Sequence, residues 1–195
     1  MVTSSHIHLL VADDGDRDVI PKSMQLIAGR PGQEYNRRKN RNGAFWEDRY
    51  HATAVEDGEH FFRCCAYLDL NMVRAGVADH PSQWPCSGYN EIQKPPKKNV
   101  LIDYEKFMEL LGPDNDEQAR QDHQGWAAEL LGNAHGRDDK WTRSIAIGSK
   151  GFVEMVKSKL GILAKGRKAT ETDAGYQLRE PANSYTHILI PKRAI

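Results

Sequence analysis

The spacing of apolar and polar residues changes along the chain and predicts strands in some segments and helices in others. Residues 6–12 (HIHLLVA) form a short apolar run in which two histidines lie two positions apart, the period of a β-strand. Residues 45–50 follow a basic loop and carry aromatic side chains, which predicts a second strand. Residues 19–27 place apolar side chains at helical spacing and predict a helix that runs on toward Asn36.

A longer helix is predicted over residues 56–73, where apolar side chains recur every three or four positions and Gly76 follows as a C-cap. Tyr67 and Asn71 lie four residues apart in this segment. Side chains at that spacing point from one face of a helix, so a phenol and an amide share one side of it.

The second half of the chain has a different pattern. Residues 94–98 (KPPKK) predict an extended linker, because two prolines between lysines disfavour regular structure. Helices are predicted over residues 102–111, 117–131 and 152–160, and a short strand over residues 176–180. We therefore expect an α+β protein with three parts: a domain at 1–93 with an antiparallel sheet and packed helices, a linker at 94–99, and a mainly helical extension at 100–195.

Composition limits the environment and the partners. The chain has 27 Lys and Arg and 27 Asp and Glu, so any binding of nucleic acid depends on local basic patches. Residues 150–168 are one such patch, which predicts either a backbone contact or the solvated face of an amphipathic helix. The cysteines, Cys64, Cys65 and Cys86, form no CxxC pair, and no apolar run reaches the roughly 18 residues of a membrane span. These features predict a cytoplasmic protein without membrane association.

Two residue sets suggest chemistry. On a strand, His6 and His8 would lie on one side, close enough to bind one metal ion, although either could be an ordinary polar strand residue. Tyr67 could be a nucleophile if a cation or a base assists it, because a phenol is protonated at neutral pH. Periodicity alone favours Tyr67 as a core aromatic residue, flanked by Cys64, Leu68 and Leu70.

Several short motifs together resemble a known family. The segment SSHIHLLV is similar to the histidine strand of single-tyrosine HUH transposases. Four further segments resemble REP-associated tyrosine transposases: YNRR at 35–38, GAFWEDRY at 43–50, YLDLNMVRAG at 67–76 and WPCSGY at 84–89. The resemblance covers about the first half of the chain and implies the HUH, ferredoxin-like fold. It also implies a bacterial, cytoplasmic protein that cleaves and rejoins hairpin-forming single-stranded DNA, commonly as a homodimer.

The resemblance implies roles for individual residues. Tyr67 would be the nucleophile that forms a 5′-phosphotyrosine link, and His6, His8 and Asn71 would hold a divalent metal ion. The family uses Mg²⁺ or Mn²⁺, whereas two imidazole ligands by themselves favour Mn²⁺ or Zn²⁺. The DNA-binding candidates supply cations for phosphates and rings for bases, and they are Arg37, Arg38, Lys39, Arg41, Arg49, Trp46 and Tyr35.

Two departures from the family pattern leave alternatives open. The family has some tens of residues before its histidine strand, whereas five precede His6, so we expect a sheet that lacks its first strands or is completed by another chain. Met72 also replaces the usual proline after the motif asparagine. A domesticated or decayed DNA-binding protein without turnover is the alternative function. A third interpretation takes the histidine pair as the first-strand motif of a metal-dependent hydrolase barrel. Such barrels need about 250 residues and eight strand–helix repeats, which the length and the irregular pattern here do not supply.

Overall fold

The computed structural model describes residues 1–3, 6–98, 101–112, 115–132 and 139–179. Within these residues the chain is α+β, with helices and a four-stranded sheet. The α-helices are α1 (Val19–Arg38), α2 (Glu59–Asp69), α3 (Asn71–Arg74), α4 (Tyr89–Gln93), α5 (Tyr104–Leu111), α6 (Asp116–Leu131), α7 (Lys140–Arg143) and α8 (Lys150–Leu160). Two 3₁₀ turns are η1 (Pro81–Gln83) and η2 (Gly161–Ala164).

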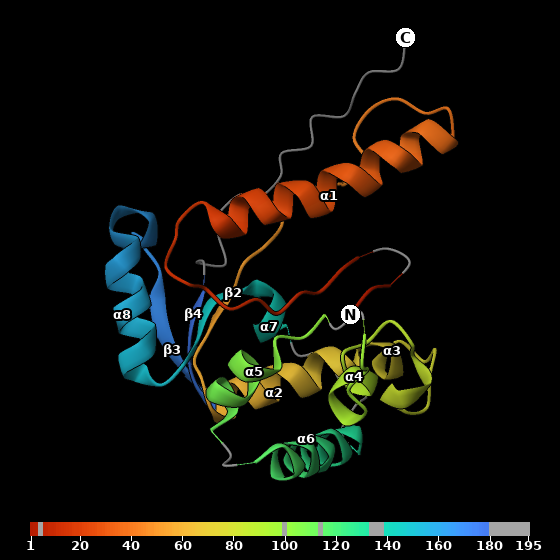
Figure 1. The fold of residues 1–195 in the computed structure, drawn as a ribbon. Coiled ribbons are helices and arrows are strands. Elements are labelled where there is room, and N and C mark those ends of the chain that lie inside the picture. The colour runs from red at the N-terminus through yellow and green to blue at the C-terminus, as the bar shows by residue number, and fades with distance from the viewer. Residues whose placement is uncertain (4–5, 99–100, 113–114, 133–138, 180–195) are drawn as a thin grey trace.

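The sheet is mixed, which corrects the expected antiparallel sheet. Its strands are β1 (Ala54–Val55), β2 (Ser144–Gly148), β3 (Lys168–Thr172) and β4 (Gly175–Arg179). Their order is β1-β2-β4-β3, with β1 parallel to β2 and the other pairs antiparallel. Helix α8 packs on the sheet, where Ala146, Val153 and Leu178 form a buried cluster (Figure 1).

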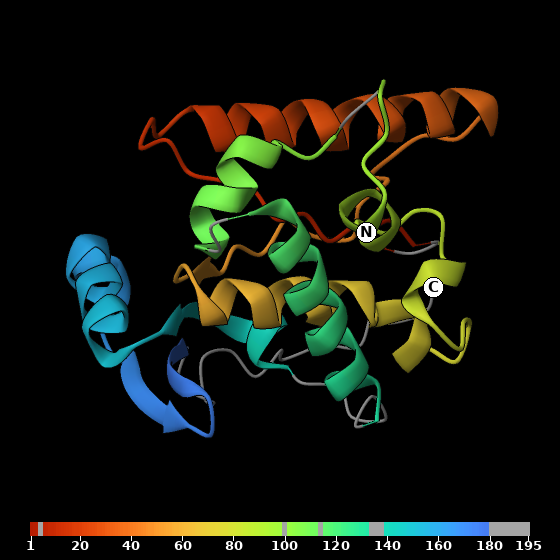
Figure 2. The ribbon, with the colours of Figure 1, turned by 60° about the horizontal axis from the view of Figure 1, so that its bottom comes forward.

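A second core lies between helices. Helix α2 packs against α5 and α6, and Figure 2 shows α6 crossing α2. The buried cluster here consists of Phe61, Phe62, Cys65, Ile92, Phe107, Leu111 and Ala119. These side chains come from both sides of the predicted 94–99 linker, of which residue 99 lies outside the description. Burying them together connects the first half of the chain to the second.

Polar N-cap residues mark the starts of three helices in the second half. Asp103 accepts a hydrogen bond from Lys106 N, Asn115 from Gln118 N, and Ser149 from Phe152 N. Each side chain satisfies a backbone N–H that the first helical turn leaves without a partner. The helices predicted over 102–111, 117–131 and 152–160 are confirmed by α5, α6 and α8.

The predicted helix at 19–36 is confirmed and is longer than expected, because α1 continues through Pro31 to Arg38. It lies along one side of the molecule (Figure 1). Its only buried residue is Gly32, which contacts the side chain of Phe45; a Cβ at Gly32 would lie 3.1 Å from the Phe45 Cβ. The close approach explains why a glycine stands inside this helix.

The predicted helix at 56–73 is present but divided. Helix α2 ends at Asp69, Leu70 adopts ψ near 3°, and α3 begins at Asn71. The predicted C-cap glycine is confirmed, since Gly76 follows α3 with a φ of 67°. Tyr67 and Asn71 therefore belong to two successive helical segments.

Two predicted strands are absent from the sheet. Residues 6–12 form no strand of the sheet, because the segment pairs only with its own start through the bridge between Val2 and Ile7. Residues 45–50 are irregular, since Phe45 and Trp46 contact α1 and not a sheet. The part after residue 100 contains α5, α6, α7 and α8, and it also supplies β2, β3 and β4, which the sequence pattern predicted only in part. The predicted strand 176–180 coincides with β4, although residue 180 and the tail to 195 lie outside the description.

In the described part of the chain, every helix is too short or too polar to cross a lipid bilayer.

Candidate functional site

The loop at residues 84–86 (WPC) holds the start of the chain, which carries His6 and His8. Val2 N donates to the Cys86 carbonyl over 3.0 Å, and the Trp84 indole Nε1 donates to the Val2 carbonyl, also over 3.0 Å. The chain then turns back on itself, with a hydrogen bond from His8 N to the Met1 carbonyl. Residues 1–3 and 6–8 are thereby held on the loop that precedes α4.

This turn brings the two imidazoles together. The ring centroids of His6 and His8 lie 4.8 Å apart, with the ring planes at 82°. His6 is exposed and His8 is half-buried. The two imidazoles are close because of this local turn and not because of strand geometry. The sequence predicted that they lie close together, but for a different structural reason.

Asn71, the first residue of α3, lies against His8. The Asn71 Nδ2 and the His8 Nε2 are 3.3 Å apart. Two metal ligands that each lie about 2.1 Å from one ion are roughly 3.0–3.4 Å apart. The distance between the Asn71 and His8 side chains therefore suits two ligands of one cation. Rotation of the Asn71 amide by half a turn puts Oδ1 in the place of Nδ2 and presents an oxygen donor.

The donor chemistry of this cluster fits a divalent transition-metal ion better than Mg²⁺. Two imidazole nitrogens and one amide oxygen form a ligand set that is mostly nitrogen, whereas Mg²⁺ prefers oxygen ligands. Across the described ranges, no group of three or more His, Cys, Asp or Glu side chains could hold a metal. An ion at His6, His8 and Asn71 would therefore retain open coordination positions for water or phosphate oxygen.

Tyr67 lies in the last turn of α2 and is 6% exposed. The guanidinium carbon of Arg74 lies 3.9 Å from the centroid of its ring, and Arg74 Nη2 donates to the Tyr67 carbonyl over 2.5 Å. The ring of Trp141 lies beside it, with the centroids 6.0 Å apart and the ring planes tilted by 34°. A cation and an indole thus both neighbour the buried phenol ring.

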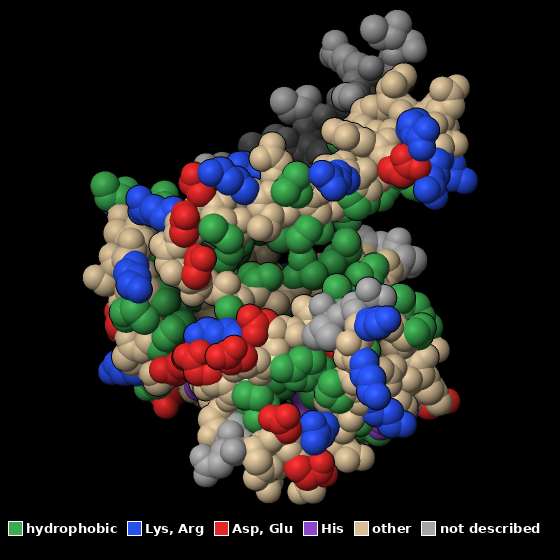
Figure 3. Space-filling view, in the orientation of Figure 1, with side chains coloured by type: hydrophobic (Ala, Val, Ile, Leu, Met, Phe, Trp, Pro, Cys, Tyr) green, Lys and Arg blue, Asp and Glu red, His purple; other side chains and the backbone are tan. Residues whose placement is uncertain are grey.

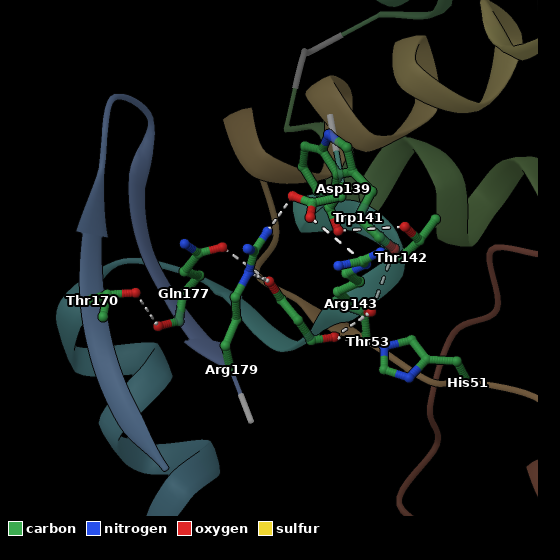
Figure 4. Close-up of polar contacts among 10 residues, drawn as sticks. His51, Thr53, Asp139, Trp141, Thr142, Arg143, Thr170, Gln177 and Arg179 are labelled. Carbon is green, nitrogen blue, oxygen red and sulfur yellow. Dashed lines mark hydrogen bonds and ion pairs between the residues drawn. The ribbon is translucent and has the colours of Figure 1, made fainter. Parts of the chain in front are cut away.

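A polar network at the start of β2 holds the segment that carries Trp141 (Figure 4). Thr53 Oγ1 donates to the Ser144 carbonyl over 2.6 Å and reaches the Trp141 carbonyl at 3.5 Å. Arg179 Nη2 binds Asp139 Oδ1 at 2.6 Å. These contacts fix α7 between β1 and β4, so the fold of the second half positions a residue beside Tyr67.

The predicted DNA-binding cations lie at and after the C-terminal end of α1. Glu34 binds two of them: Arg37 Nε and Nη2 each lie 2.9 Å from its carboxylate, and Arg38 Nε lies 2.6 Å from Oε1. Hydrogen bonds from Arg37 and Arg38 lower the pKa of the Glu34 carboxyl. Lys39 and Arg49 are exposed. Figure 3 shows basic side chains gathered with an acidic one at this end of α1.

The loop after α1 is held to the helix by local bonds. The fifth predicted cation, Arg41, donates from Nη2 to the Ala44 carbonyl over 3.0 Å. The Trp46 indole donates to the Ala28 carbonyl over 2.8 Å, which ties its ring to α1. Rotation of that indole toward a nucleotide base would break this bond.

The other predicted stacking residue is more accessible. Tyr35 is 41% exposed, and its ring lies 4.9 Å from the ring of Phe45, which in turn contacts Trp46 edge to face at 4.9 Å. The exposed ring of Tyr35 therefore offers a surface for stacking, supported from below by two other aromatic rings.

Three residues of this region were not predicted from sequence. Arg74 lies in the quoted YLDLNMVRAG segment, so its position three residues after Asn71 was a usable signal. Trp141 and His123 come from distant segments, and no spacing in the sequence connects them to the helix that carries Tyr67. Only the fold brings them there.

Comparisons with models of known protein families, with curated proteins and with solved structures give no match.

Proposed function

We propose that the protein is a single-stranded DNA transesterase of the HUH transposase type, with Tyr67 as the nucleophile. The observation that carries the proposal is the 3.3 Å contact between His8 and Asn71. It joins residues 63 positions apart, and Asn71 follows Tyr67 by four residues, across the break at Leu70. His8 thus contacts the start of α3, directly after the helix that carries Tyr67, and this contact supports a common site.

Each side chain has a chemical task in this proposal. The phenol oxygen of Tyr67 attacks the phosphorus of a phosphodiester, its proton passes to water, and the bond from phosphorus to the 3′ oxygen breaks. The DNA 5′-phosphate stays on the tyrosine, and the other strand end leaves as a 3′-hydroxyl. A divalent ion bound by His6, His8 and Asn71 supplies charge stabilisation at the phosphate oxygens.

Access to Tyr67 requires local movement. Its ring is covered by Arg74 and Trp141, so substrate binding has to displace at least one of them. A displaced Arg74 guanidinium can bind the phosphate that enters, because guanidinium groups pair well with phosphate oxygens. The arginine would then change partners, from the aromatic ring in the free protein to DNA in the complex.

The test is formation of a covalent protein–DNA adduct. A labelled hairpin oligonucleotide is incubated with the protein and Mn²⁺, and the products are separated in SDS. We expect an SDS-resistant labelled band that is lost in Tyr67→Phe and without the metal. Tyr50→Phe is the matched control, because Tyr50 is 49% exposed and should leave the band unchanged. An equal band in Tyr67→Phe contradicts the proposal.

The burial of Tyr67 favours a second candidate, a DNA-binding protein without turnover. In that case the aromatic ring is a packing residue under Arg74, and the basic end of α1 binds DNA alone. A mobility shift of the hairpin without any adduct supports this candidate. Loss of the shift in an Arg38→Ala, Lys39→Ala double variant would then locate the binding surface.

A further inference from the structure

The turn η2 presents two adjacent apolar side chains to solvent. Ile162 is 89% exposed and Leu163 is 73% exposed, while the following Ala164 is buried and fixes the turn. Single apolar residues on a surface are ordinary, but two neighbours this exposed at a turn gain nothing for folding. In Figure 3 hydrophobic and basic side chains meet at the C-terminal end of α8, at the upper left.

Five cations lie close in sequence to this apolar pair. Four of them line an open hollow of about 770 Å³ beside η2 and β3, where Glu154 is the acidic residue among the described residues of the lining, and the fifth lies in the last turn of α8. The cations are Lys157, Lys159, Lys165, Arg167 and Lys168. The local charge is strongly positive although the whole chain is neutral.

The fold accounts for some of these cations and leaves others unexplained. Lys157 and Lys159 lie in the last turn of α8, where positive charge is favourable near the helix C-terminus. Arg167 donates to the Leu163 carbonyl and so supports η2. Lys165 and Lys168 are exposed, and within the described ranges no carboxylate pairs with them. Their charge is available to a ligand.

We propose that the α8–η2 tip, defined as residues 157–168, is a second nucleic-acid contact that binds the duplex stem of a hairpin. The lysines bind phosphates along one strand, and Ile162 and Leu163 pack into the groove against sugars and base edges. The choice of nucleic acid as the polyanion rests on the proposed function. The cations that line the hollow suit the phosphates of one strand, and the neighbouring apolar residues Ile162 and Leu163 suit the groove beside that strand.

The position of the tip supports a stem contact. Figures 1 and 2 both place α8 at one end of the molecule and α3, with the Asn71 site, toward the other. A hairpin cleaved near α3 could therefore extend its stem across the body to α8. Binding at two separated places fixes the direction of the stem relative to the scissile phosphate.

The test is fluorescence anisotropy of a labelled hairpin with a blunt duplex stem, without metal, over a series of salt concentrations. We expect Lys165→Ala/Lys168→Ala to raise the Kd roughly tenfold, and to make the slope of log K against log salt less steep by about 2. Ile162→Ser/Leu163→Ser should weaken binding with the slope unchanged. Lys97→Ala/Lys98→Ala, which removes two exposed lysines elsewhere, is the matched control.

Two results overturn the inference. One is wild-type affinity and slope in the lysine double variant, with its fold verified by circular dichroism. The other is binding of the tip to phosphatidylserine vesicles, lost in the same variant, without any effect on the hairpin. If the wild-type protein forms the adduct and the lysine double variant binds the hairpin normally, only the inference about the α8–η2 tip is wrong. If the lysine double variant binds the stem less tightly but the wild-type protein forms no adduct, only the transesterase proposal is wrong.

Discussion

Asp69 and His123 form a buried pair that joins the end of α2 to α6. Asp69 Oδ2 lies 2.9 Å from His123 Nε2, and the two side chains are 4% and 0% exposed. Gln93 Nε2 lies 3.0 Å from His123 Nδ1 and can only donate, so Nδ1 accepts and Nε2 carries the proton to Asp69. Asp69 stands between Tyr67 and Asn71, so this pair anchors the segment that carries both.

Removal of the Asp69 carboxylate should destabilise the protein. We expect Asp69→Ala to lower the free energy of unfolding by about 2 to 3 kcal/mol, because it leaves a buried N–H of His123 without a partner. Asp69→Asn keeps an acceptor oxygen and should cost about 1 kcal/mol. Urea denaturation measures both. Equal losses in the two variants would show that His123 does not need an acceptor at this position.

Replacement of Arg74 should affect both stability and the proposed reaction. Arg74→Gln removes the cation over the Tyr67 ring, and we expect a loss of about 1 to 2 kcal/mol in unfolding free energy. We also expect the rate of adduct formation to fall on the order of tenfold, because a positioned cation stabilises phosphate charge in the transition state.

The matched control is Arg63→Gln. Arg63 lies over the Trp126 ring at 4.8 Å, on the same helix as Tyr67, and binds Glu59. The Arg63→Gln substitution should lower the unfolding free energy about as much as Arg74→Gln does and leave the rate of adduct formation unchanged. Equal effects of the two substitutions on the adduct rate would mean that Arg74 acts only through folding.

The buried thiols of α2 predict a loss of stability at high pH. Burial raises the pKa of the Cys64 thiol from 9.0 to about 12 and raises the pKa of Cys65 well above its usual value. Between pH 9 and about 12 the thiols ionise in the unfolded chain but stay protonated in the folded one, so the unfolding free energy falls as pH rises.

Thiol labelling at pH 8 checks the same burial. One cysteine, the exposed Cys86, should react with a disulfide reagent in the native protein, and all three should react in denaturant. Rapid native labelling of Cys64 or Cys65 would show that α2 opens far more easily than its packing indicates.

Glu34 should limit DNA binding at the end of α1. Its carboxylate binds Arg37 and Arg38, so Glu34→Gln releases two cations for phosphate contacts. We expect roughly threefold tighter binding of single-stranded DNA, with a steeper salt dependence. Glu47→Gln makes the same charge change at an exposed residue and should have a smaller effect. Equal tightening in both variants would indicate a general effect of net charge.

Helical periodicity was a good guide to the helices because their burial is one-sided. Residues 102–111 and 117–131 bury one stripe against α2, and this stripe is visible in the sequence. The division of the 56–73 helix at Leu70 was not visible, since the residues on either side keep helical spacing.

The sheet was harder to predict because its strands pair across long separations. Strand β1 has only two residues and pairs with β2 about 90 positions later. Strand β2 is short and almost entirely buried, and a run of this kind has no alternation that separates it from a helix. Strand β3 is polar and lies at the edge, so its sequence resembles a loop.

The candidate site shows the same division between local and distant signals. The proximity of Tyr67 to Asn71 follows from spacing within one segment. The contact between His8 and Asn71 depends on Trp84 and Cys86, which hold the first residues of the chain. The strand geometry expected for His6 and His8 was wrong, yet the turn that replaces it also places their rings side by side.

Peptide mapping of the protein–DNA adduct decides whether Tyr67 is the nucleophile. The protein is incubated with hairpin DNA and Mn²⁺, the DNA is trimmed with nuclease, and tryptic peptides are analysed by mass spectrometry. We expect a nucleotide joined through phosphate to Tyr67, with no modified peptide in Tyr67→Phe. A nucleotide on any other residue, or no adduct under conditions where the hairpin is bound, contradicts this expectation.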